Sequence, residues 1–382
     1  MKNIAIIGGG IGGLCTAIAL QKQGHDVKVF ESAPHLKPLG AGLGLAANAI
    51  KALLDIGIGQ DILKAGNVLS SFEILNQQGK LITKTDSLKV SKQFGTDNFT
   101  IHRADLHTIL LQHLAPHTLE LGKSCTTVVQ NSKEVEIRFK DGSTSYADCL
   151  IAMDGIHSQI RQQLLPQSKP RYAGYTCWRA VIDTQPEHFN PAKATETWGT
   201  KGRFGIVPLS GKRIYWFACL NAAQADKHLA AFSVNDLIQN FKDYHAPVPQ
   251  ILALTHDSQL IHNDIIDIKP IKQFAFGKIV LAGDAAHATT PNMGQGACQA
   301  IEDAIVLANC IKNSSTVEEA FQVFEHKRVN RTTKIVNTSW QVGKMAQVEN
   351  PLLAAIRDML LRIVPPSVND KQLQFLYNVD FT

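Results

Sequence analysis

The sequence NIAIIGGGIGGLCTAIALQKQGHDVKVFE, residues 3–31, contains the pattern on which the fold prediction depends. Residues 3–8 form a β-branched run that is typical of a short buried strand. The glycine-rich turn that follows leads into a helical pattern, for which Gly24 is a natural end. Residues 25–31 predict a second strand that ends in an acid, Glu31. This order of strand, glycine turn, helix, strand and acid predicts a βαβ unit.

The glycines of this turn predict a dinucleotide-binding site, because Gly8, Gly10 and Gly13 give the pattern GxGxxG. The first glycine allows a tight turn, the second lets the backbone approach a pyrophosphate, and the third lets the helix pack on the strand. The helix N-terminus then offers free N–H groups to the phosphates. Glu31 is placed to accept a hydrogen bond from a ribose 2′-hydroxyl and would repel a 2′-phosphate. The pattern does not distinguish FAD from NAD.

Composition limits the other classes of function. The 382 residues favour two lobes or one large domain with an insertion, and 38 basic against 33 acidic residues give a net charge of only +5. Without a dense Lys/Arg run, no nucleic-acid partner is predicted. The seven cysteines and 14 histidines are scattered without metal spacing. No apolar stretch is long enough for a membrane span, and the N-terminus lacks a signal-peptide pattern, so we expect a cytoplasmic protein with reduced thiols.

The rest of the chain predicts an α/β domain that is discontinuous in sequence, together with a sheet-based second lobe. Buried strands are expected at 149–153 and 278–283, and strands dominate from 172 to 220. A group of antiparallel strands is expected at 125–130, 134–139 and 144–147. The predicted helices cover residues 104–114, 233–243, 297–311, 316–342 and 351–366.

Two further motifs follow predicted strands. Asp154-Gly155 comes directly after one of them, and Ser158 and Arg161 stand at i and i+3, so both can face one way. Taken by itself, this pattern equally fits a common turn with a serine cap.

The second motif is GDAAHATTPNMGQG, residues 283–296. Asp284, at a strand end, can accept hydrogen bonds from polyol hydroxyls. Gly294 and Gly296 permit backbone contact with a flat ring. The helix that starts near Ala297 would stabilise negative charge on a reduced flavin.

Together, the stretches 8–13, 154–161 and 283–296 resemble the three ordered motifs of the class A, single-component FAD-dependent monooxygenases, the aromatic hydroxylases. The resemblance covers most of the chain, including 40–57 and 102–110. Residues 171–183 and the strands after them are similar to the urate hydroxylase, salicylate hydroxylase and zeaxanthin epoxidase branches. Met153 departs from the alanine that is usual before the DG pair, and we expect it to be tolerated at the end of a buried strand.

The resemblance implies an α/β fold: an FAD-binding, Rossmann-like (GR2-type) domain with an inserted mixed β-sheet substrate domain and a C-terminal helix. The implied FAD-binding domain comprises 1–70, 100–170 and 275–345, the substrate domain 71–99 and 171–274, and the C-terminal helical segment 346–382. NADH or NADPH would reduce FAD without a Rossmann domain of its own. O2 would then form a flavin C4a-hydroperoxide that hydroxylates or epoxidises an electron-rich small aromatic or conjugated substrate.

The resemblance also implies a role for particular residues. The adenosine and pyrophosphate side of FAD would be held by Gly8, Gly10, Gly12, Gly13, Glu31, Arg103 and Val128. Asp154 and Arg161 would link FAD and the incoming nicotinamide, and Asp284 would bind the ribityl chain. The isoalloxazine would be bordered by Gly44, Leu45, Gly294, Gln295, Gly296 and Ala297, with Pro291 where the hydroperoxide forms.

The substrate-contacting residues are predicted from strand alternation, which places Arg203 on one face of its strand and Tyr215 on one face of the next. Facing the flavin, they would offer a cation and a phenol to an anionic aromatic ring, and urate hydroxylases of this group carry a similar pair. Alternatively, Tyr215 is half-buried core and Arg203 forms a surface ion pair. Arg179 is an equal candidate. His287 is expected to be structural rather than a general base.

Two alternative functions stay open at this point. One is a flavin-dependent halogenase or reductase, although the halogenase motif WxWxIP is not present and WRAVI (178–182) does not match it. The other is a non-catalytic FAD-binding protein. The apolar face of 351–366 is expected to pack on the FAD domain or on a partner subunit rather than on a membrane, and the chain is expected to be a monomer or a homodimer.

Overall fold

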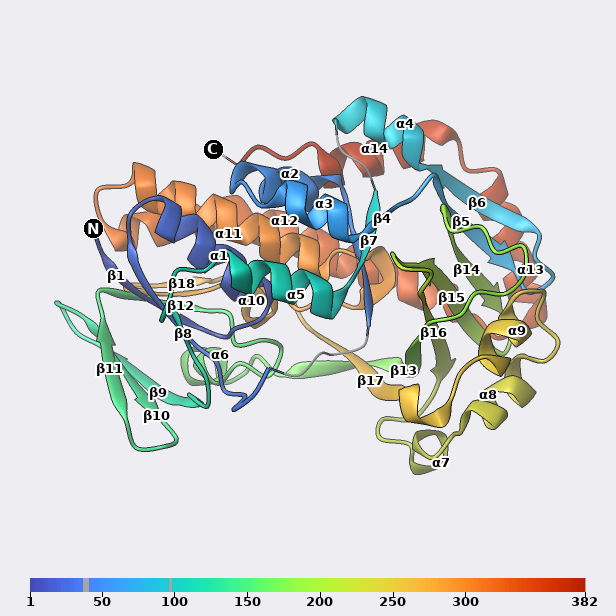
Figure 1. Ribbon diagram of the computed structural model, residues 1–382, viewed down its shortest axis with the longest axis horizontal. Helices are drawn as coiled ribbons and strands as arrows, with labels where there is room; N and C mark the ends of the chain where they lie inside the picture. The colour runs from blue at the N-terminus through green and yellow to red at the C-terminus, as the bar shows by residue number, and fades with distance from the viewer. Residues whose placement is uncertain (37–40, 96–97, 382) are drawn as a thin grey trace.

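The computed structural model describes residues 1–36, 41–95 and 98–381, so that Gly40, which begins the stretch 40–57, and Thr382 lie outside the described residues. Two sheets lie side by side along the long axis of the molecule (Figure 1). The first has six strands, in the order β18 (Ala275–Phe276), β19 (Ile279–Leu281), β12 (Cys149–Ala152), β1 (Asn3–Ile7), β2 (Asp26–Phe30) and β8 (Leu119–Glu120).

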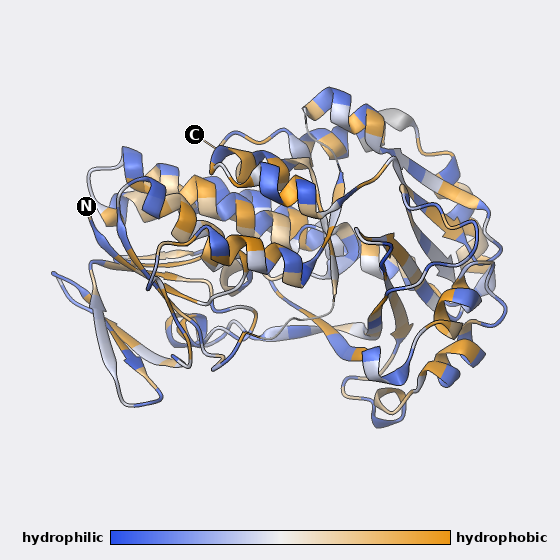
Figure 2. Ribbon diagram, in the orientation of Figure 1, coloured by the Kyte–Doolittle hydropathy of each residue, from blue (hydrophilic) through white to orange (hydrophobic). Residues whose placement is uncertain are grey.

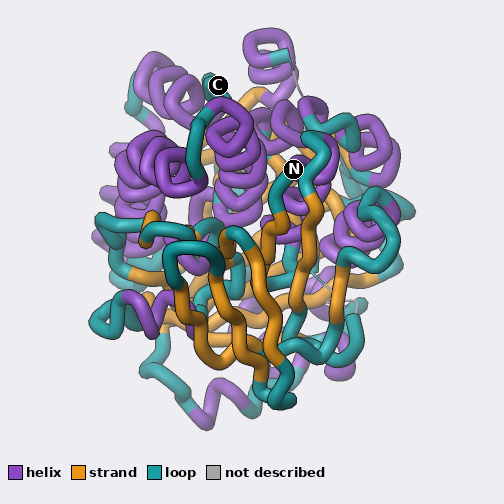
Figure 3. Tube along the Cα trace, turned by 90° about the vertical axis from the view of Figure 1, so that its left-hand side faces the viewer, coloured by secondary structure: helices purple, strands orange, loops and turns teal. Residues whose placement is uncertain are grey.

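The six-stranded sheet is parallel apart from the edge strand β18. Its central strands are buried along nearly their whole length, as expected of parallel strands covered on both faces. Helices gather above it, as Figures 1 and 3 show. They are α1 (Ile11–Lys22), α5 (Arg103–Gln112), α11 (Gly296–Asn313) and α12 (Val317–Ala346). The predicted antiparallel group forms a smaller sheet of β9 (Cys125–Gln130), β10 (Val135–Phe139) and β11 (Thr144–Ala147), which shares the same apolar core.

The second sheet has seven strands and is mixed. Its order is β17 (Ile261–Ile268), β13 (Pro170–Ile182), β16 (Ile214–Asn221), β15 (Gly202–Pro208), β14 (Lys193–Gly199), β5 (Ser71–Asn76) and β6 (Leu81–Asp86), with only β14 and β5 parallel. One face packs against α8 (Val234–Phe241) and α9 (Val248–Ala253) through a core that includes Trp178, Phe204 and Trp216. A short helix, α7 (Lys227–Ala230), lies nearby (Figure 1).

Small elements join the two sheets. A three-stranded sheet consists of β3 (Gly42–Leu45), β7 (Phe99–His102) and β4 (Asn67–Val68). The helices α2 (Ala47–Asp55), α3 (Gly59–Ala65) and α4 (Ser87–Phe94) lie between its strands in sequence, and α6 (Gln159–Leu164) precedes the long strand β13. The strands β13 and β17 run between the two parts of the molecule (Figure 1).

The predicted α/β class with an inserted mixed sheet is confirmed, and the predicted strands and helices lie within a few residues of the observed ones. The helix that begins the βαβ unit ends at Lys22, and Gly24 has the left-handed backbone expected after a helix. The exact domain boundaries stay a prediction. None of the helices in the described residues has the length and apolar character that a membrane crossing requires.

The C-terminal segment differs from the prediction. Instead of one helix over 351–366, the structure has α13 (Pro351–Arg362) and α14 (Pro366–Tyr377). Two successive prolines at 365 and 366 end the first helix and start the second, because proline is tolerated in the first turn of a helix but not in its interior. The apolar face of α13 is exposed and does not pack on the FAD domain, and the alternative of packing on a partner subunit stays a prediction.

Candidate active site

The glycine turn after β1 has a backbone that only glycine fits. Gly8 has a φ of +111°, and a Cβ added to it would lie 2.2 Å from the carbonyl oxygen of Met153. A Cβ on Gly13 would lie 1.9 Å from the carbonyl oxygen of Gly8. In contrast, a Cβ on Gly10 would have no neighbouring heavy atom within 4 Å. The first and third glycines therefore serve close packing, and the second borders open space.

Glu31 closes the turn from the end of β2. Its carboxylate accepts hydrogen bonds from the Gly9 amide, at 2.7 Å, and from the Ala33 amide, at 2.8 Å. The structure thus brings Glu31 to the glycine turn, as the βαβ pattern predicts. Gly12 packs against α11, where its added Cβ would lie 3.0 Å from the Ala300 Cβ.

The unusual Met153 is accommodated beside the same helix. Its side chain is buried, and its sulfur accepts a hydrogen bond from the Thr16 hydroxyl at 3.3 Å.

The DG motif forms the start of α6. One carboxylate oxygen of Asp154 accepts the Gln159 amide at 2.9 Å, and Ser158 caps the helix as the common-turn alternative suggested. The other oxygen, Oδ1, is buried without a hydrogen-bond partner among the described residues. Burial raises the pKa of Asp154. An unpartnered buried oxygen is costly in a folded protein, so it marks a position where a ligand group would fit.

Arg161 joins the DG motif to the GD motif. Its guanidinium is fully buried and donates to the carbonyl oxygen of Ala285 at 3.1 Å and to that of Ile156. Burial lowers the pKa of Arg161, and the carboxylates of Asp154 and Asp284 act in the opposite direction. This arginine thus holds the short helix α10 (Asp284–His287) against α6, and its predicted contact with the nicotinamide stays a prediction.

Asp284 lies at the end of the strand β19, as predicted, and its side chain reaches solvent although protein surrounds it. Burial raises the pKa of Asp284, whereas His287, Arg103 and Arg161 act to lower it. Within the described part of the chain, no hydrogen bond or ion pair engages the side chain of Asp284 or of Arg103. An acceptor and a cation near enough to act on each other are therefore both available to a ligand.

A buried ionic network supports the loop from below. Asp303 accepts the Gly283 amide at 2.7 Å, the His287 ring at 2.6 Å and the Arg328 guanidinium at 2.6 Å. The structural role predicted for His287 agrees with this contact. The network continues through Glu302, which accepts hydrogen bonds from Arg328, Arg331, Asn48 and Gln299.

Sequence reasoning missed this network. A signal was present, because two adjacent acids interrupt the otherwise apolar helix pattern at 302 and 303, and two arginines stand three residues apart at 328 and 331. Buried charges at such positions need partners.

The loop before α11 has the backbone that the motif predicted. Gly294 has a φ of +61° and open space beside it, and α11 begins at Gly296 without a side-chain cap. The first amides of this long helix, which include that of Ala297, thus keep their partial positive charge available. Gln295 is buried, and its side chain accepts from Asn48 at 3.1 Å and from Gln299 at 3.0 Å. Pro291 is exposed at the start of a short 3-10 turn.

Three other predicted positions lie around these motifs. Gly44, in β3, borders open space, whereas its neighbour Leu45 is buried in the core. Val128 is buried in β9, and both its amide and its carbonyl are hydrogen-bonded to the side chain of Gln163. Their roles toward FAD stay predictions.

The face of the seven-stranded sheet opposite α8 and α9 carries the predicted substrate residues. Strand register places Arg203 opposite Cys219, Val207 opposite Tyr215 and Arg179 opposite Phe217. Arg203 is buried rather than exposed, so the surface ion pair considered for it is wrong. Its guanidinium donates to Glu196 at 3.0 Å, to Asn292 at 2.9 Å and to Gln347 at 2.8 Å.

Arg203 therefore connects the sheet to the loop of Pro291 through Asn292, and these partners engage three of its five N–H groups. Tyr215 is half-buried and packs on Gly42 of β3, where an added Cβ would lie 2.7 Å from the ring. Arg179 is half-buried, and no carboxylate among the described residues pairs with it. Its Nε is buried without a hydrogen-bond partner.

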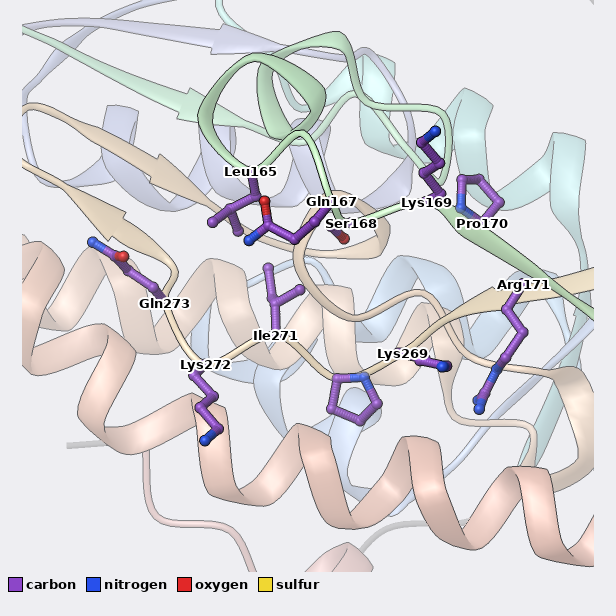
Figure 4. Close-up of a pocket in the computed structure, with 11 residues that line it drawn as sticks. Leu165, Gln167, Ser168, Lys169, Pro170, Arg171, Lys269, Ile271, Lys272 and Gln273 are labelled. Atoms are coloured by element: carbon purple, nitrogen blue, oxygen red, sulfur yellow. The ribbon is translucent and has the colours of Figure 1, made fainter.

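A pocket of about 700 Å³ lies apart from these residues (Figure 4). It is formed by the segment between α6 and β13 and by the segment after β17, and its lining includes Lys169, Lys269 and Lys272. None of the predicted site residues lines it. Among the described residues, no group of three or more His, Cys, Asp or Glu side chains could hold a metal ion.

The residues present fit FAD. Open space borders Gly10, Gly44, Gly155 and Gly294, which is the room that a dinucleotide and its ring need. Asp284 would accept hydrogen bonds from the ribityl hydroxyls, and Arg103 would bind phosphate. The N-terminus of α11 would stabilise negative charge on the reduced ring. When bound and reduced by a nicotinamide, this cofactor supplies the activation of O2.

Comparisons with known proteins agree with this site. A family model described as FAD binding domain matches residues 1–339. The aurachin C monooxygenase/isomerase of Stigmatella aurantiaca is 37% identical over 381 residues, covering 100% of this chain and 98% of that protein. The 2-heptyl-3-hydroxy-4(1H)-quinolone synthase of Pseudomonas aeruginosa is 30% identical, covering 98% and 97%. The solved structure of Klebsiella pneumoniae HpxO with FAD and uric acid has a TM-score of 0.90 at 27% identity, covering 100% and 98%.

Fold, site and relatives define a flavoprotein monooxygenase. It uses FAD, NAD(P)H and O2 to hydroxylate or epoxidise an electron-rich aromatic or conjugated substrate. The chain belongs to the FAD-binding-domain family, and the resemblance to class A monooxygenases is confirmed.

Replacing Asp284 by alanine is expected to weaken FAD binding about 10- to 100-fold, the effect of losing a hydrogen bond to a charged group. The fold should be retained, because no hydrogen bond or ion pair among the described residues engages this side chain. Titration of the apoprotein with FAD, followed by flavin fluorescence, measures the change. Asp284→Asn keeps an acceptor and should lose less. Unchanged FAD affinity in Asp284→Ala would show that the carboxylate does not contact the cofactor.

Proposed function

We propose that the substrate is a 2-alkyl-4-quinolone, hydroxylated on the ring carbon next to the carbonyl group. One relative supports this class, since the quinolone synthase has a quinolone in its name and matches this chain over nearly its whole length. That ring carbon is electron-rich, because the ring nitrogen donates electrons to it through the conjugated double bond. Such a carbon is the kind of site that an electrophilic oxygen attacks.

The observation that carries the proposal is the pair of donors formed by Arg179 and Tyr215. Both lie on the face of the sheet that looks away from α8 and α9, in the neighbouring strands β13 and β16. Burial raises the pKa of Tyr215 above its usual value, with Cys177 adding to the effect and Arg179 opposing it. The phenol therefore stays protonated at neutral pH. A carbonyl oxygen, which only accepts, complements two donors.

The sheet also offers a flat apolar surface beside these donors. Phe217 stands next to Tyr215 on the same face, with ring centroids 6.1 Å apart. Its ring covers Gly205, where an added Cβ would lie 2.0 Å from a ring carbon. A bicyclic ring would stack on this surface with its carbonyl group toward Arg179. The protein would thus bind and orient the ring, and exclude water from it.

The test uses the purified, FAD-loaded protein. Oxidation of NADH and of NADPH is followed with 2-heptyl-4-quinolone, unsubstituted 4-quinolone, urate and salicylate, with peroxide measured in parallel. Stimulation by the quinolone with little peroxide, and a product heavier by one oxygen atom, is expected. Stimulation by urate or salicylate instead would overturn the substrate class. Failure of both nicotinamides to reduce FAD would instead favour a non-catalytic FAD-binding protein.

Replacing Arg179 by methionine is expected to lower kcat/KM for the quinolone about 10- to 100-fold, the effect of losing a hydrogen bond from a charged donor. FAD content and thermal stability should stay at the wild-type level. Lys201→Met, at an exposed position in the turn between β14 and β15, is the control and should leave kcat/KM unchanged. If Arg179→Met retains the wild-type kcat/KM, the carbonyl group is bound elsewhere.

A further inference from the structure

The helix α13 buries its charged side and exposes its apolar side, the reverse of an ordinary surface helix. Its two charged residues in mid-helix, Arg357 and Asp358, are buried against the protein. Six large apolar residues, one of them Ile363 at the C-cap, are between 42% and 71% exposed, whereas Leu361 packs against the sheet. The six share one side of the helix and are here called the α13 patch: Leu352, Leu353, Ile356, Met359, Leu360 and Ile363. A contiguous apolar surface of this kind on a protein marks a binding surface.

The patch belongs to a well-anchored helix. The side chain of Asn350 caps its N-terminus and accepts the amides of Leu352 and Leu353 at 3.0 and 3.1 Å. Arg357 binds Asp358 at 2.8 Å and lies over the ring of Trp198, a residue of β14. Near the other end, Arg362 donates to the carbonyl oxygen of Leu81 at 3.0 Å. These contacts fix the helix on the seven-stranded sheet with its apolar side outward.

We propose that the α13 patch binds the surface of an anionic phospholipid bilayer, with the helix lying in the plane of the membrane interface. An amphipathic helix that lies flat at an interface buries its apolar side among the acyl chains. The polar side of α13 contacts the rest of the protein instead of water, because Arg357 and Asp358 are buried against the protein. Leu81, which is also exposed, extends the apolar surface beside Arg362.

Charge at the rim favours anionic lipid over a second copy of the chain. From 349 to 365 the acids are Glu349, which is exposed before the helix, and Asp358, which is buried and paired with Arg357. Arg362 and, next to Leu81, Lys80 are exposed cations. Cations near the membrane are attracted to anionic headgroups. Two patches placed face to face would instead bring like charges together.

The helix α13 packs on the sheet that also carries the proposed substrate residues. In Figure 1 the helix lies at the right-hand end of the molecule, far from β1. Figure 2 colours the same view by the hydropathy of each residue. The helix packs against β6, at one edge of the sheet that carries Arg179 and Tyr215. The biological sense of this arrangement rests on the proposed function, because an alkyl-bearing quinolone would concentrate in the bilayer.

The test measures lipid binding without substrate, so its outcome does not depend on the proposed reaction. Full-length, FAD-loaded protein is sedimented with vesicles of phosphatidylcholine, and with vesicles that contain one quarter phosphatidylglycerol. We expect binding that is at least tenfold stronger to the anionic vesicles. The double variant Ile356→Gln/Leu360→Gln should bind the anionic vesicles at least tenfold more weakly than the wild type. Both residues are exposed, so FAD absorbance and Tm should not change.

Two control variants separate the contributions. Val129→Gln replaces an exposed apolar residue of β9, at the other end of the molecule, and should bind vesicles like the wild type. Arg362→Glu should reduce the preference for anionic vesicles. Wild-type protein that sediments with neither vesicle, or patch variants that bind as well as wild type, would overturn the proposal. A wild-type dimer that the double variant converts to a monomer would assign the patch to a second copy instead.

Discussion

The substitution Gly8→Ala is expected to abolish FAD binding and to destabilise the fold by about 2–6 kcal/mol. Backbone strain at a φ of +111° contributes about 1–3 kcal/mol of this. Overpacking contributes about 1–3 kcal/mol more, since the new Cβ would lie 2.2 Å from the carbonyl oxygen of Met153. Because Met153 directly precedes Asp154, the displacement would reach both the glycine turn and the DG motif. FAD absorbance per protein and urea unfolding of the apoprotein measure the two effects.

Gly10→Ala is the matched control for this variant. Gly10 has a φ of −76° and a ψ of −178°, which any residue adopts, and open space lies beside it. The apoprotein should therefore unfold within about 0.5 kcal/mol of wild type. FAD binding should still weaken at least tenfold, because the new methyl group would occupy the room that the pyrophosphate needs. Full flavin content in Gly8→Ala would contradict the close packing described for the turn.

Replacing Arg328 by methionine is expected to destabilise the protein by about 3–5 kcal/mol, the typical effect of removing one partner from a buried ion pair. Arg328 is buried and bonds both Asp303 and Glu302 at 2.6 Å. Without it, two buried carboxylates lose their shared cation. Asn330→Met, an exposed position on the same helix, should change stability by less than about 0.5 kcal/mol. Urea unfolding of both variants provides the comparison.

The same substitution should change the acid sensitivity of the protein. Burial acts to raise the pKa of Asp303, but His287 and Arg328 outweigh it and lower the pKa to about 2. Because an unfolded Asp titrates near pH 3.9, this carboxylate stabilises the fold above about pH 4. That stabilisation is lost as the pH falls through about 2. In Arg328→Met one cation is absent, so the loss should begin at a higher pH. A difference in urea midpoint between wild type and Arg328→Met that stays constant from pH 5 to pH 2 would contradict this.

The cofactor side of the site was predictable because its motifs are local. Gly8, Gly13 and Glu31 lie within one βαβ unit, so their spacing in sequence already determines how they meet. Asp284 likewise lies three residues after the end of its strand, β19. In each case the predicted strand end places the residue, and no information from distant parts of the chain is needed.

The substrate side was less predictable. The alternation of side chains along a strand shows which residues share a face of the sheet, but not which other residues contact that face. Arg203 and Tyr215 do share a face. Only the fold shows that Asn292 and Gln347, far away in sequence, bind Arg203, whereas Arg179 has no carboxylate partner among the described residues. For the same reason, the apolar side of α13 suggested a packing contact that the tertiary structure does not make.

The order of the strands in the six-stranded sheet has a consequence for synthesis. β12 pairs with β1 on one side and, on the other, with β19, which is made about 130 residues later. Until β19 and α11 leave the ribosome, the nascent chain carries half of a cofactor site and an apolar strand with an open edge. At ordinary rates of translation this state lasts for seconds to tens of seconds. An open edge of that kind is prone to pair with other chains. Added FAD would not stabilise such a chain, because the part of the cofactor site that β19 and α11 supply has not yet been made.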